Sequence, residues 1–385
     1  MMPHLSDENA FEKKLIDCRR KLHATPELAF EEYETTRLIK EQLSGAAVEL
    51  LDFPLETGVL AVIRGKHPGP VLALRSDIDA LPVQEATGLP FASKIPGRMH
   101  ACGHDFHMTA ILGAAQLLNS RKDQLAGTVK ILFQPAEEIG RGAQRVLESG
   151  VLSDVAAIFS MHDMPSLPTG TIGINEGAMM AGVDRFMIDI EGIGSHAASP
   201  EKGSDVIVTA SQIVTALQSI VSRNLSPLDS AVISITRIQS GNTWNVLPQN
   251  AQLEGTVRTF DEKVSSVIAE RMEAVVTRVA AAFGVKAALN YMKIGPALRN
   301  VPQLATWSQE SAERSGLTVV QPSPSFAGED FAEYLKKIPG AFFFMGVSGT
   351  ADLHHPDMTI DEKAILPSSH FFANLAEDML KKITR

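Results

Sequence analysis

Residues that can bind divalent metals are concentrated in four short segments of the chain. The segments are MHACGHDFH from Met99, FQPAEE from Phe133, MHD from Met161 and LHHP from Leu353. Six of the eleven histidines lie in three of them, whereas a random surface distribution would spread them along the sequence. This clustering indicates a metal site rather than scattered structural or exposed histidines.

The residue types in these segments match the ligands that zinc takes in proteins, namely thiolate, imidazole and carboxylate. Glu137 and Glu138 are adjacent carboxylates that would point in different directions at a strand end, so that one can bind metal while the other stays free as a base. The remaining candidate ligands are Cys102, His104, His162 and one of the pair His354 and His355. Because more than four ligands are present, a two-metal site is reasonable, with the ions roughly 3.5 to 4 Å apart.

The elements that must position these residues alternate between helix and strand over the first half of the chain. The spacing of apolar residues predicts helices over 9–24, 31–43, 104–119 and 142–148, and strands over 58–65, 70–79, 128–133 and 155–161. Short apolar runs bounded by Gly and Pro are typical of strands buried on both faces, so we expect a helix-covered, mainly parallel sheet. The carboxyl ends of parallel strands meet at one edge, where the four segments can converge.

A different order of elements follows over residues 183–294. Strands are expected over 183–191, 231–238, 251–259 and 286–294, with helices over 204–222 and 263–283. This β-α-β-β-α-β order is the ferredoxin-like pattern. We therefore predict an α/β protein with a discontinuous catalytic domain, residues 1–181 and 295–385, and an inserted domain, residues 182–294.

Composition and charge narrow the classes of partner. The formal net charge of -10 over 385 residues argues against a nucleic-acid surface, which needs clustered Lys and Arg. The first residues lack a basic stretch followed by an apolar region, and we find no run of about 18 to 20 apolar residues. With Cys18 and Cys102 as the two cysteines, no disulfide framework is expected. We expect a cytoplasmic protein that acts on a small molecule, with no nucleic-acid or membrane partner.

Longer motifs in a fixed order identify a family resemblance that covers essentially the whole chain. The motifs are LRSDIDALP from Leu74, MHACGHD from Met99, FQPAEE from Phe133, MH from Met161, GSHAASP from Gly194, NVLP from Asn245, GTVR from Gly255, GEDF from Gly328 and LHHP from Leu353. In these motifs the sequence resembles the M20 metallopeptidase family. Within it, the chain is similar to the amidohydrolase branch of hippurate hydrolases, N-acyl-amino-acid deacetylases and auxin-conjugate hydrolases.

The resemblance implies roles for individual residues. It implies that the metal ligands are Cys102, His104, Glu138, His162 and His354. Glu137 would be the general base, and His354 is preferred to His355 because the family pattern is Leu-His-x-Pro. Asp77 and Asp79 are expected to support the ligands without binding metal. The inserted domain resembles the family's lid and dimerisation domain, in which His196, Asn245 and Arg258 would contact substrate, with His196 acting in the partner subunit's site.

The predicted activity is metal-dependent hydrolysis of the amide bond of N-acyl amino acids, such as N-acetyl or N-benzoyl derivatives, by a homodimer. Thiolate and imidazole ligands favour zinc, while manganese, cobalt and nickel stay open. An aminopeptidase or dipeptidase of the same family is the alternative enzyme, since the same metal chemistry would serve it. A catalytically silent sensor of acylated amino acids is the alternative from another class, against which the retention of Glu137 argues.

Overall fold

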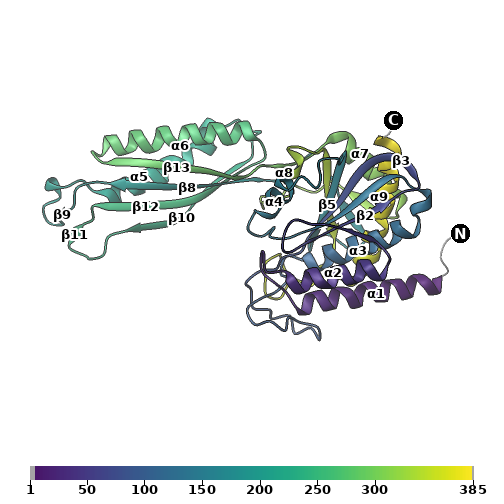
Figure 1. Cartoon of the computed structure of the whole chain (residues 1–385). Helices are drawn as coiled ribbons and strands as arrows, with labels where there is room; N and C mark the ends of the chain where they lie inside the picture. The colour runs from purple at the N-terminus through teal and green to yellow at the C-terminus, as the bar shows by residue number, and fades with distance from the viewer. Residues whose placement is uncertain (1–4, 384–385) are drawn as a thin grey trace. The chain divides into compact units, whose positions relative to one another are not determined.

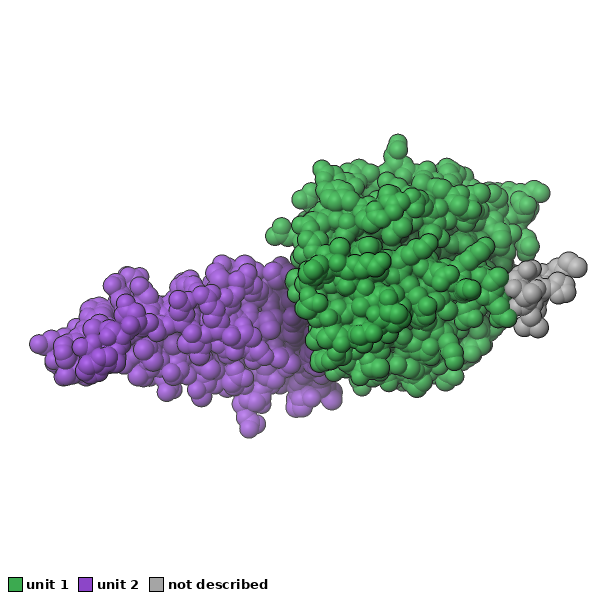
Figure 2. Space-filling model, turned by 90° about the horizontal axis from the view of Figure 1, so that it is seen from below, with its two compact units in different colours: residues 1–179, 299–323, 330–385 green, residues 180–298, 324–329 purple. Residues whose placement is uncertain are grey.

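The computed structural model describes residues 5–383, which form two compact units (Figures 1 and 2). Unit 1 contains residues 1–179, 299–323 and 330–385, and unit 2 contains residues 180–298 and 324–329. Unit 1 is therefore discontinuous in sequence, and most of unit 2 is a single insertion. The short return at 324–329 follows from an isolated parallel bridge between Met180 and Ser325.

An eight-stranded sheet forms the centre of unit 1, in the order β1-β2-β4-β3-β5-β16-β6-β15. The strands are β1 Glu49–Leu51, β2 Val59–Arg64, β3 His67–Asp77, β4 Ala126–Gln134, β5 Ala157–Met164, β6 Thr171–Gly173, β15 Thr318–Val320 and β16 Gly340–Gly346. The neighbours β4, β3, β5 and β16 run parallel to one another, whereas β1, β2 and β6 each have an antiparallel partner. The predicted α/β class with a mainly parallel sheet is confirmed.

Helices cover this sheet, with α3 and α9 both packed on β3 (Figure 1). The helices of unit 1 are α1 Leu5–Ala24, α2 Tyr33–Gly45, α3 His104–Ser120, α4 Gly142–Glu148, α7 Pro302–Arg314, α8 Ala332–Leu335 and α9 Ile365–Ile383. All seven residues of β16 are buried, as are nearly all of β2 and β5, which agrees with the apolar runs that the sequence shows. The short strands β7 Gly177–Met180 and β14 Leu298–Asn300 pair with each other.

Unit 2 has one four-stranded antiparallel sheet with two helices on one face (Figure 1). Its elements are β8 Gly182–Glu191, α5 Val206–Ser219, β10 Ala231–Ser240, β12 Asn250–Thr259, α6 Glu262–Ala282 and β13 Lys286–Gly295. The sheet order β10-β12-β8-β13 and the β-α-β-β-α-β sequence are those of a ferredoxin-like fold. A second pair of short strands, β9 Ser195–His196 and β11 Val246–Leu247, forms a separate ladder that the sequence did not predict.

The alternation of buried and exposed residues along β8 explains how unit 2 packs. Phe186, Ile188 and Ile190 of β8 point into a core with the helices, while the residues between them are partly or fully exposed. The segment Val206–Asn224, which includes α5, is apolar and long enough to cross a membrane by length and composition. Because α5 contributes buried residues such as Ile213 and Leu217 to this core, its hydrophobicity has an explanation within the fold.

Candidate metal centre

The predicted ligands in unit 1 lie where three parallel strands reach the same edge of the sheet. Glu137 and Glu138 follow the end of β4, and His162 lies near the end of β5. His104 is the first residue of α3, in the crossover that leaves β3. This is the arrangement expected for a site at the carboxyl ends of parallel strands. Segments that are more than 200 residues apart thus supply side chains to one place.

Donor atoms from five residues come within a few ångströms of one another. The Sγ of Cys102 lies 3.3 Å from Nε2 of His162 and 3.2 Å from Nε2 of His354. Two oxygens of Glu138 lie 3.8 Å from Nε2 of His104 and 3.7 Å from Nε2 of His354. Three overlapping sets have all their donor atoms within 4.8 Å of one another: Cys102, His104, His162; Cys102, Glu138, His354; and His104, Glu137, Glu138.

Two of these donors make no hydrogen bond to any described residue. His104 Nε2 and Glu138 Oε1 are buried and lack a hydrogen bond within the part of the chain that the structure describes. Buried polar atoms in folded proteins are nearly always paired, so an unpaired imidazole nitrogen facing an unpaired carboxylate oxygen calls for an additional partner. A thiol, imidazoles and a carboxylate are together a donor set that suits a divalent metal ion. The residues present therefore fit the metal that the sequence predicts.

Backbone carbonyls orient two of the imidazoles. Nδ1 of His104 donates to the carbonyl oxygen of Asp79 at 2.8 Å, and Nδ1 of His162 donates to the carbonyl oxygen of Asp163 at 2.8 Å. Each bond places the ring proton on Nδ1 and leaves the Nε2 lone pair directed at the cluster. Hydrogen bonds of this kind commonly fix the tautomer of a metal-binding histidine.

A buried network of hydrogen-bonded side chains lies next to the ligands. Asp77 accepts hydrogen bonds from Nδ1 of His107 at 2.7 Å and from Arg75 at 2.8 Å, and all three side chains are buried. Nε2 of His107 accepts the N–H of Asp163 at 2.8 Å. Asp77 thus binds neighbours on β3 and α3, and its Oδ2 also lies 3.8 Å from Nε2 of His104.

The turn between Cys102 and His104 needs glycine. Gly103 has a φ of 73°, and a Cβ at this position would lie 2.2 Å from Oδ1 of Asp163. A side chain here would therefore clash with a buried acid and would also strain the backbone. The Cys-Gly-His motif places a thiol and an imidazole on either side of a turn that is tight enough to pass Asp163.

Burial and charge shift the pKa values of the ligands in ways that couple metal binding to proton release. Burial, and then the charge of Glu138, raise the pKa of the Cys102 thiol well above 9.0. Burial lowers the pKa of His104, but the charge of Asp77 and the hydrogen bond to Asp79 outweigh it and raise the pKa well above 6.5. Because metals bind the deprotonated forms, these groups must lose protons when an ion binds.

The two adjacent glutamates have different surroundings. Glu138 faces His104 and His354, whereas Oε1 of Glu137 accepts the backbone N–H of Asp330 at 3.4 Å. The Oε2 of Glu137 lies 4.0 Å from Nε2 of His104, so this carboxylate borders the ligand cluster. The two side chains thus share His104 as a neighbour and differ in their other partners.

The histidine pair near the C-terminus separates in the same way. His354, with a φ of 65°, directs Nε2 at Cys102 and Glu138. His355 instead accepts the N–H of Asp357 through Nδ1, at 3.1 Å, and both histidine side chains are exposed. Of the two, His354 is the one whose ring reaches the other candidate ligands.

The residues assigned to substrate lie in unit 2, in two separate places. His196 in β9 is opposite Val246 of β11, and the carbonyl oxygen of Asn245 accepts the N–H of Ala197 at 3.1 Å. Arg258 is near the other end of β12, where it pairs with Val183 at the start of β8. His196 and Asn245 are thus neighbours, whereas Arg258 lies at the end of β12 that pairs with the start of β8.

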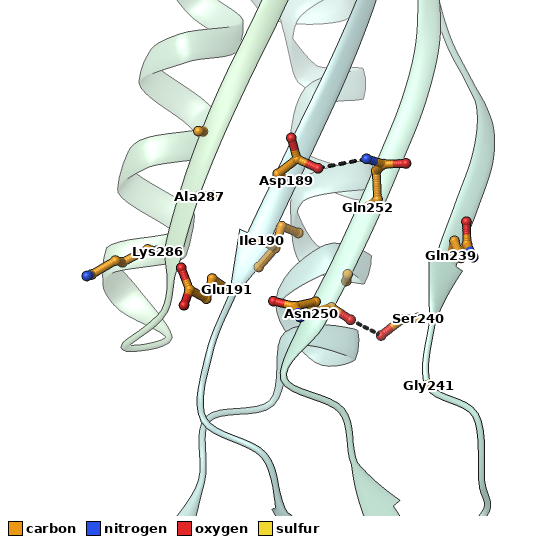
Figure 3. A pocket seen from close by; sticks show the side chains of 12 residues that line it. Asp189, Ile190, Glu191, Gln239, Ser240, Gly241, Asn250, Gln252, Lys286 and Ala287 are labelled. Carbon is orange, nitrogen blue, oxygen red and sulfur yellow. Dashed lines mark hydrogen bonds between the residues drawn. The ribbon is translucent and has the colours of Figure 1, made fainter.

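A cavity of about 700 Å³ also lies in unit 2, over the end of its sheet (Figure 3). Its lining includes Asp189, Glu191, Gln252 and Lys286, and Gln252 donates to Asp189 at 2.8 Å. None of the predicted ligands is among the described residues that line it. We therefore assign the reaction chemistry to the cluster in unit 1.

Networks next to the centre contain residues that sequence reasoning missed. His23, which lies outside the four ligand segments, is buried between Asp105 and Glu85, and its ring nitrogens lie 2.9 and 3.2 Å from their oxygens. Glu32 is fully buried and accepts the N–H of Ala136, directly before Glu137 and Glu138. Neither residue belongs to a motif. The partners of His23 are at least 62 positions away in the sequence, and those of Glu32 are at least 25 positions away.

Comparisons with known proteins agree with this geometry. The model of peptidase family M20/M25/M40 matches residues 73–378. The chain is 51% identical to an N-acetylcysteine deacetylase of Bacillus subtilis over 98% of this chain and 99% of that protein, and 48% identical to an N-acetyl-L-cysteine deacetylase of the same species over 97% and 89%. A solved structure of the Bacillus subtilis YXEP protein, described as a dinuclear metal-binding M20 peptidase, has a TM-score of 0.89 at 48% identity and covers 97% of this chain and 99% of that chain.

Proposed function

The chain belongs to peptidase family M20/M25/M40, and we propose that it hydrolyses the amide bond of N-acyl amino acids, releasing a carboxylic acid and the free amino acid. It is a metal-dependent amidohydrolase. The observation that carries the proposal is the ligand cluster with a second glutamate beside it, in a chain half identical to an N-acetylcysteine deacetylase. N-acetyl amino acids are accordingly the first substrates to test.

Five side chains would hold two divalent ions. They are Cys102, His104, Glu138, His162 and His354. Bound divalent ions supply a Lewis acid for the amide carbonyl and favour deprotonation of the attacking water. We propose zinc as the resident metal because of the thiol and imidazoles, with manganese, cobalt and nickel as the other candidates.

Glu137 carries out the proton transfers. Its carboxylate accepts a proton from the attacking water and delivers it to the nitrogen of the departing amine, as general acid-base catalysis requires of a positioned group. Its place at the border of the cluster, next to Glu138 but directed elsewhere, supports this role. His196 stabilises the developing oxyanion, Asn245 contacts the substrate, and Arg258 binds the α-carboxylate, since a guanidinium fits a carboxylate with two hydrogen bonds.

The separation of His196 and Arg258 supports a homodimer in which His196 serves the partner subunit's site. Arg258 is opposite Val183, eight residues before Glu191 at the far end of β8, and His196 follows beyond that end. At the rise of a β-strand this separates the two residues by roughly 25 Å. One small acylated amino acid cannot contact both, so two chains would have to contribute to one site.

The exposed face of α5 is a suitable surface for such a dimer. Helix α5 contains no charged residue, and Ile207 and Val208 are 45% and 43% exposed. Helix α6, on the same face of the sheet, exposes charged side chains such as Glu270, Arg271 and Arg278 instead. Depletion of charge with exposed aliphatic side chains is typical of an interface core. We therefore propose dimerisation through unit 2. We also propose that the enzyme is cytoplasmic.

The substrate class is tested on purified protein loaded with zinc or manganese. N-acetyl-L-cysteine, other N-acetyl amino acids, N-benzoylglycine and free dipeptides are assayed in parallel, with the released amine quantified and metal content measured on the same sample. We expect release from the N-acyl compounds. Turnover of dipeptides alone would replace the proposal with a peptidase, and binding of N-acyl compounds without turnover would replace it with a sensor.

Two variants test the assigned roles. Glu137→Gln should keep its metal but lose about 10²- to 10⁴-fold in kcat, the usual contribution of a positioned proton-transfer group. His196→Ala should fold and bind metal but be slow. Mixed dimers of the two variants should regain activity, because one of their two sites contains both an intact base and an intact histidine from the other chain. Mixed dimers that stay inactive would contradict the exchange of His196.

A further inference from the structure

Two buried carboxylates hold the turn that carries the two glutamates of the metal centre. The N–H of Ala136 donates to Oε1 of Glu32 at 2.9 Å. The N–H groups of Glu137 and Glu138 donate to Oδ1 and Oδ2 of Asp79, both at 3.0 Å. Glu32 and Asp79 are both fully buried. Three consecutive N–H groups therefore bind acids from elsewhere in the chain, as in the anion-binding turns called nests.

The backbone of this turn needs such support. Ala136 has a φ of 58°, in the left-handed region that a residue with a Cβ rarely adopts. Conformations of this kind persist only where the surrounding structure fixes them, and they are concentrated at functional sites. The carbonyl of Ala136 accepts the N–H of Gly142 at 3.1 Å, so the turn is closed on its other side as well.

Glu32 is placed where an acid would ordinarily cap a helix, but its side chain does not cap. It directly precedes α2 and makes no capping hydrogen bond. The cap is made by Glu27, which accepts the N–H groups of Glu34 and Thr35 at 3.1 and 2.8 Å. The carboxylate of Glu32 instead binds Ala136 and accepts the hydroxyl of Thr57 at 2.7 Å. Two acids at one helix end thus have different tasks.

Burying an acid in this way is costly unless its contacts are needed. Burial raises the pKa of Glu32 from 4.5 to about 7, against the lowering effect of its hydrogen bonds to Thr57 and Ala136. Its side-chain hydrogen bonds within the described residues go to Thr57 and to the N–H of Ala136. The hydrogen bonds of Glu32 best explain why a buried acid is present if the turn must be held in one conformation.

We propose that Glu32 is a positioning residue for the hydrolytic reaction. By accepting the N–H of Ala136 it fixes the left-handed conformation of that residue. This conformation, together with the bonds to Asp79, determines where Glu137 and Glu138 point. Glu32 thus acts through the turn on both the base and a metal ligand. The inference rests on the proposed function for the role of Glu137, but its effect on metal binding does not depend on the substrate.

Three variants test the proposal on the full-length metal-loaded protein. Glu32→Leu removes the acceptor and keeps the bulk, and Glu32→Gln keeps an oxygen of the right length without the charge. Glu27→Leu is the matched control, because it removes an acceptor of two N–H groups at the same helix end but leaves Ala136 alone. The readouts are kcat, KM, zinc affinity by chelator competition, and melting temperature.

The expected pattern separates positioning from stability. Glu32→Leu should lose about 10- to 100-fold in kcat and in zinc affinity, the range for removal of a residue that supports a metal ligand, with KM nearly unchanged. Glu32→Gln should restore most of both. Glu27→Leu should lower the melting temperature to a similar extent while kcat and zinc affinity stay near wild type. Equal losses in the Glu27 and Glu32 leucine variants would overturn the proposal.

A second pair of variants decides the matter if Glu32→Leu does not fold. Glu32→Asp keeps the charge but withdraws the acceptor by one methylene, and Glu32→Gln does the reverse. The proposal requires Gln to be active and Asp to be impaired, and the opposite order would refute it. Loss of zinc affinity in the Asp variant tests the inference even if no N-acyl amino acid is hydrolysed, so failure of the proposed activity can be told apart from failure of this role.

Discussion

The buried pair of acids around His23 gives a pH dependence of stability that can be measured. His23 of α1 contacts Asp105 at 2.9 Å and Glu85 at 3.2 Å, and Arg19 lies 2.9 Å from the same Asp105 oxygen. Burial lowers the pKa of His23, but the charge of Asp105 and hydrogen bonds to Asp105 and Glu85 outweigh it and raise the pKa from 6.5 to about 9, against the opposing charge of Arg19. His23 is therefore positively charged at neutral pH in the folded protein.

The size and direction of the effect follow from this pKa. A rise from 6.5 to about 9 corresponds to about 3 kcal/mol of unfolding free energy. The folded state holds the proton more tightly than the unfolded state. The stabilisation is therefore complete below pH 6.5 and is lost as the pH rises from 6.5 to about 9. Replacement of His23 by Gln keeps a neutral donor and removes this titration.

The assay is denaturant unfolding of wild type and His23→Gln between pH 6 and 9.5, with both proteins saturated with the same metal. The difference in unfolding free energy should be largest at pH 6 and shrink by about 3 kcal/mol at pH 9.5. Titrations elsewhere cancel in this difference. His67→Gln, at an exposed histidine, is the control for the substitution itself. A flat profile for His23→Gln would refute the assignment of a charged His23.

Three further predictions concern the metal, one helix cap and Glu32. Removal of metal with a chelator should abolish hydrolysis and lower the melting temperature, and added zinc or manganese should restore both, as metal analysis, kcat and thermal melts will show. Asp261→Ala, which removes an acceptor for the N–H of Lys263 at the start of α6, should cost about 1 kcal/mol in denaturant unfolding with kcat unchanged. Because burial raises the pKa of Glu32 from 4.5 to about 7, the folded state holds its proton more tightly, so the unfolding free energy of wild type relative to Glu32→Gln should fall by up to about 3 kcal/mol as pH rises from 4.5 to 7, as urea unfolding of both proteins will show.

The ligand cluster could be predicted from the sequence because its residues lie at the ends of predicted strands. Glu137 and Glu138 directly follow the apolar run that becomes β4, and His162 ends the run that becomes β5. Parallel strands bring such positions together whatever their separation in sequence. Chemistry alone left His354 and His355 equivalent, and the family pattern was needed to choose between them. Which side chains bind metal remains a prediction, although the geometry that it requires is present.

The supporting residues were not accessible, because their partners are single residues far away in the chain. Asp105 is 82 positions from His23, and Ala136 is 104 positions from Glu32. A periodic pattern reports which face of an element is buried, but not which acid meets which amide. The ladder of β9 and β11 was not predicted for a related reason, because strands of two residues are too short to show an alternation of apolar and polar residues. The antiparallel direction of β2 against β4 likewise could not be predicted, because it depends on how the chain connects the two strands and not on their amino-acid composition.

Adjacent glutamates can have opposite roles only if the backbone between them is fixed. Each carboxylate already has an oxygen within 4.0 Å of Nε2 of His104, so a flexible turn would let either one take the position of a metal ligand. A metal would then bind both acids and leave no base. Asp79 removes this freedom by holding the N–H groups of both residues, and Glu32 fixes the residue before them. The distinction between ligand and base is thus set by two acids that themselves touch neither metal nor substrate in the proposed reaction.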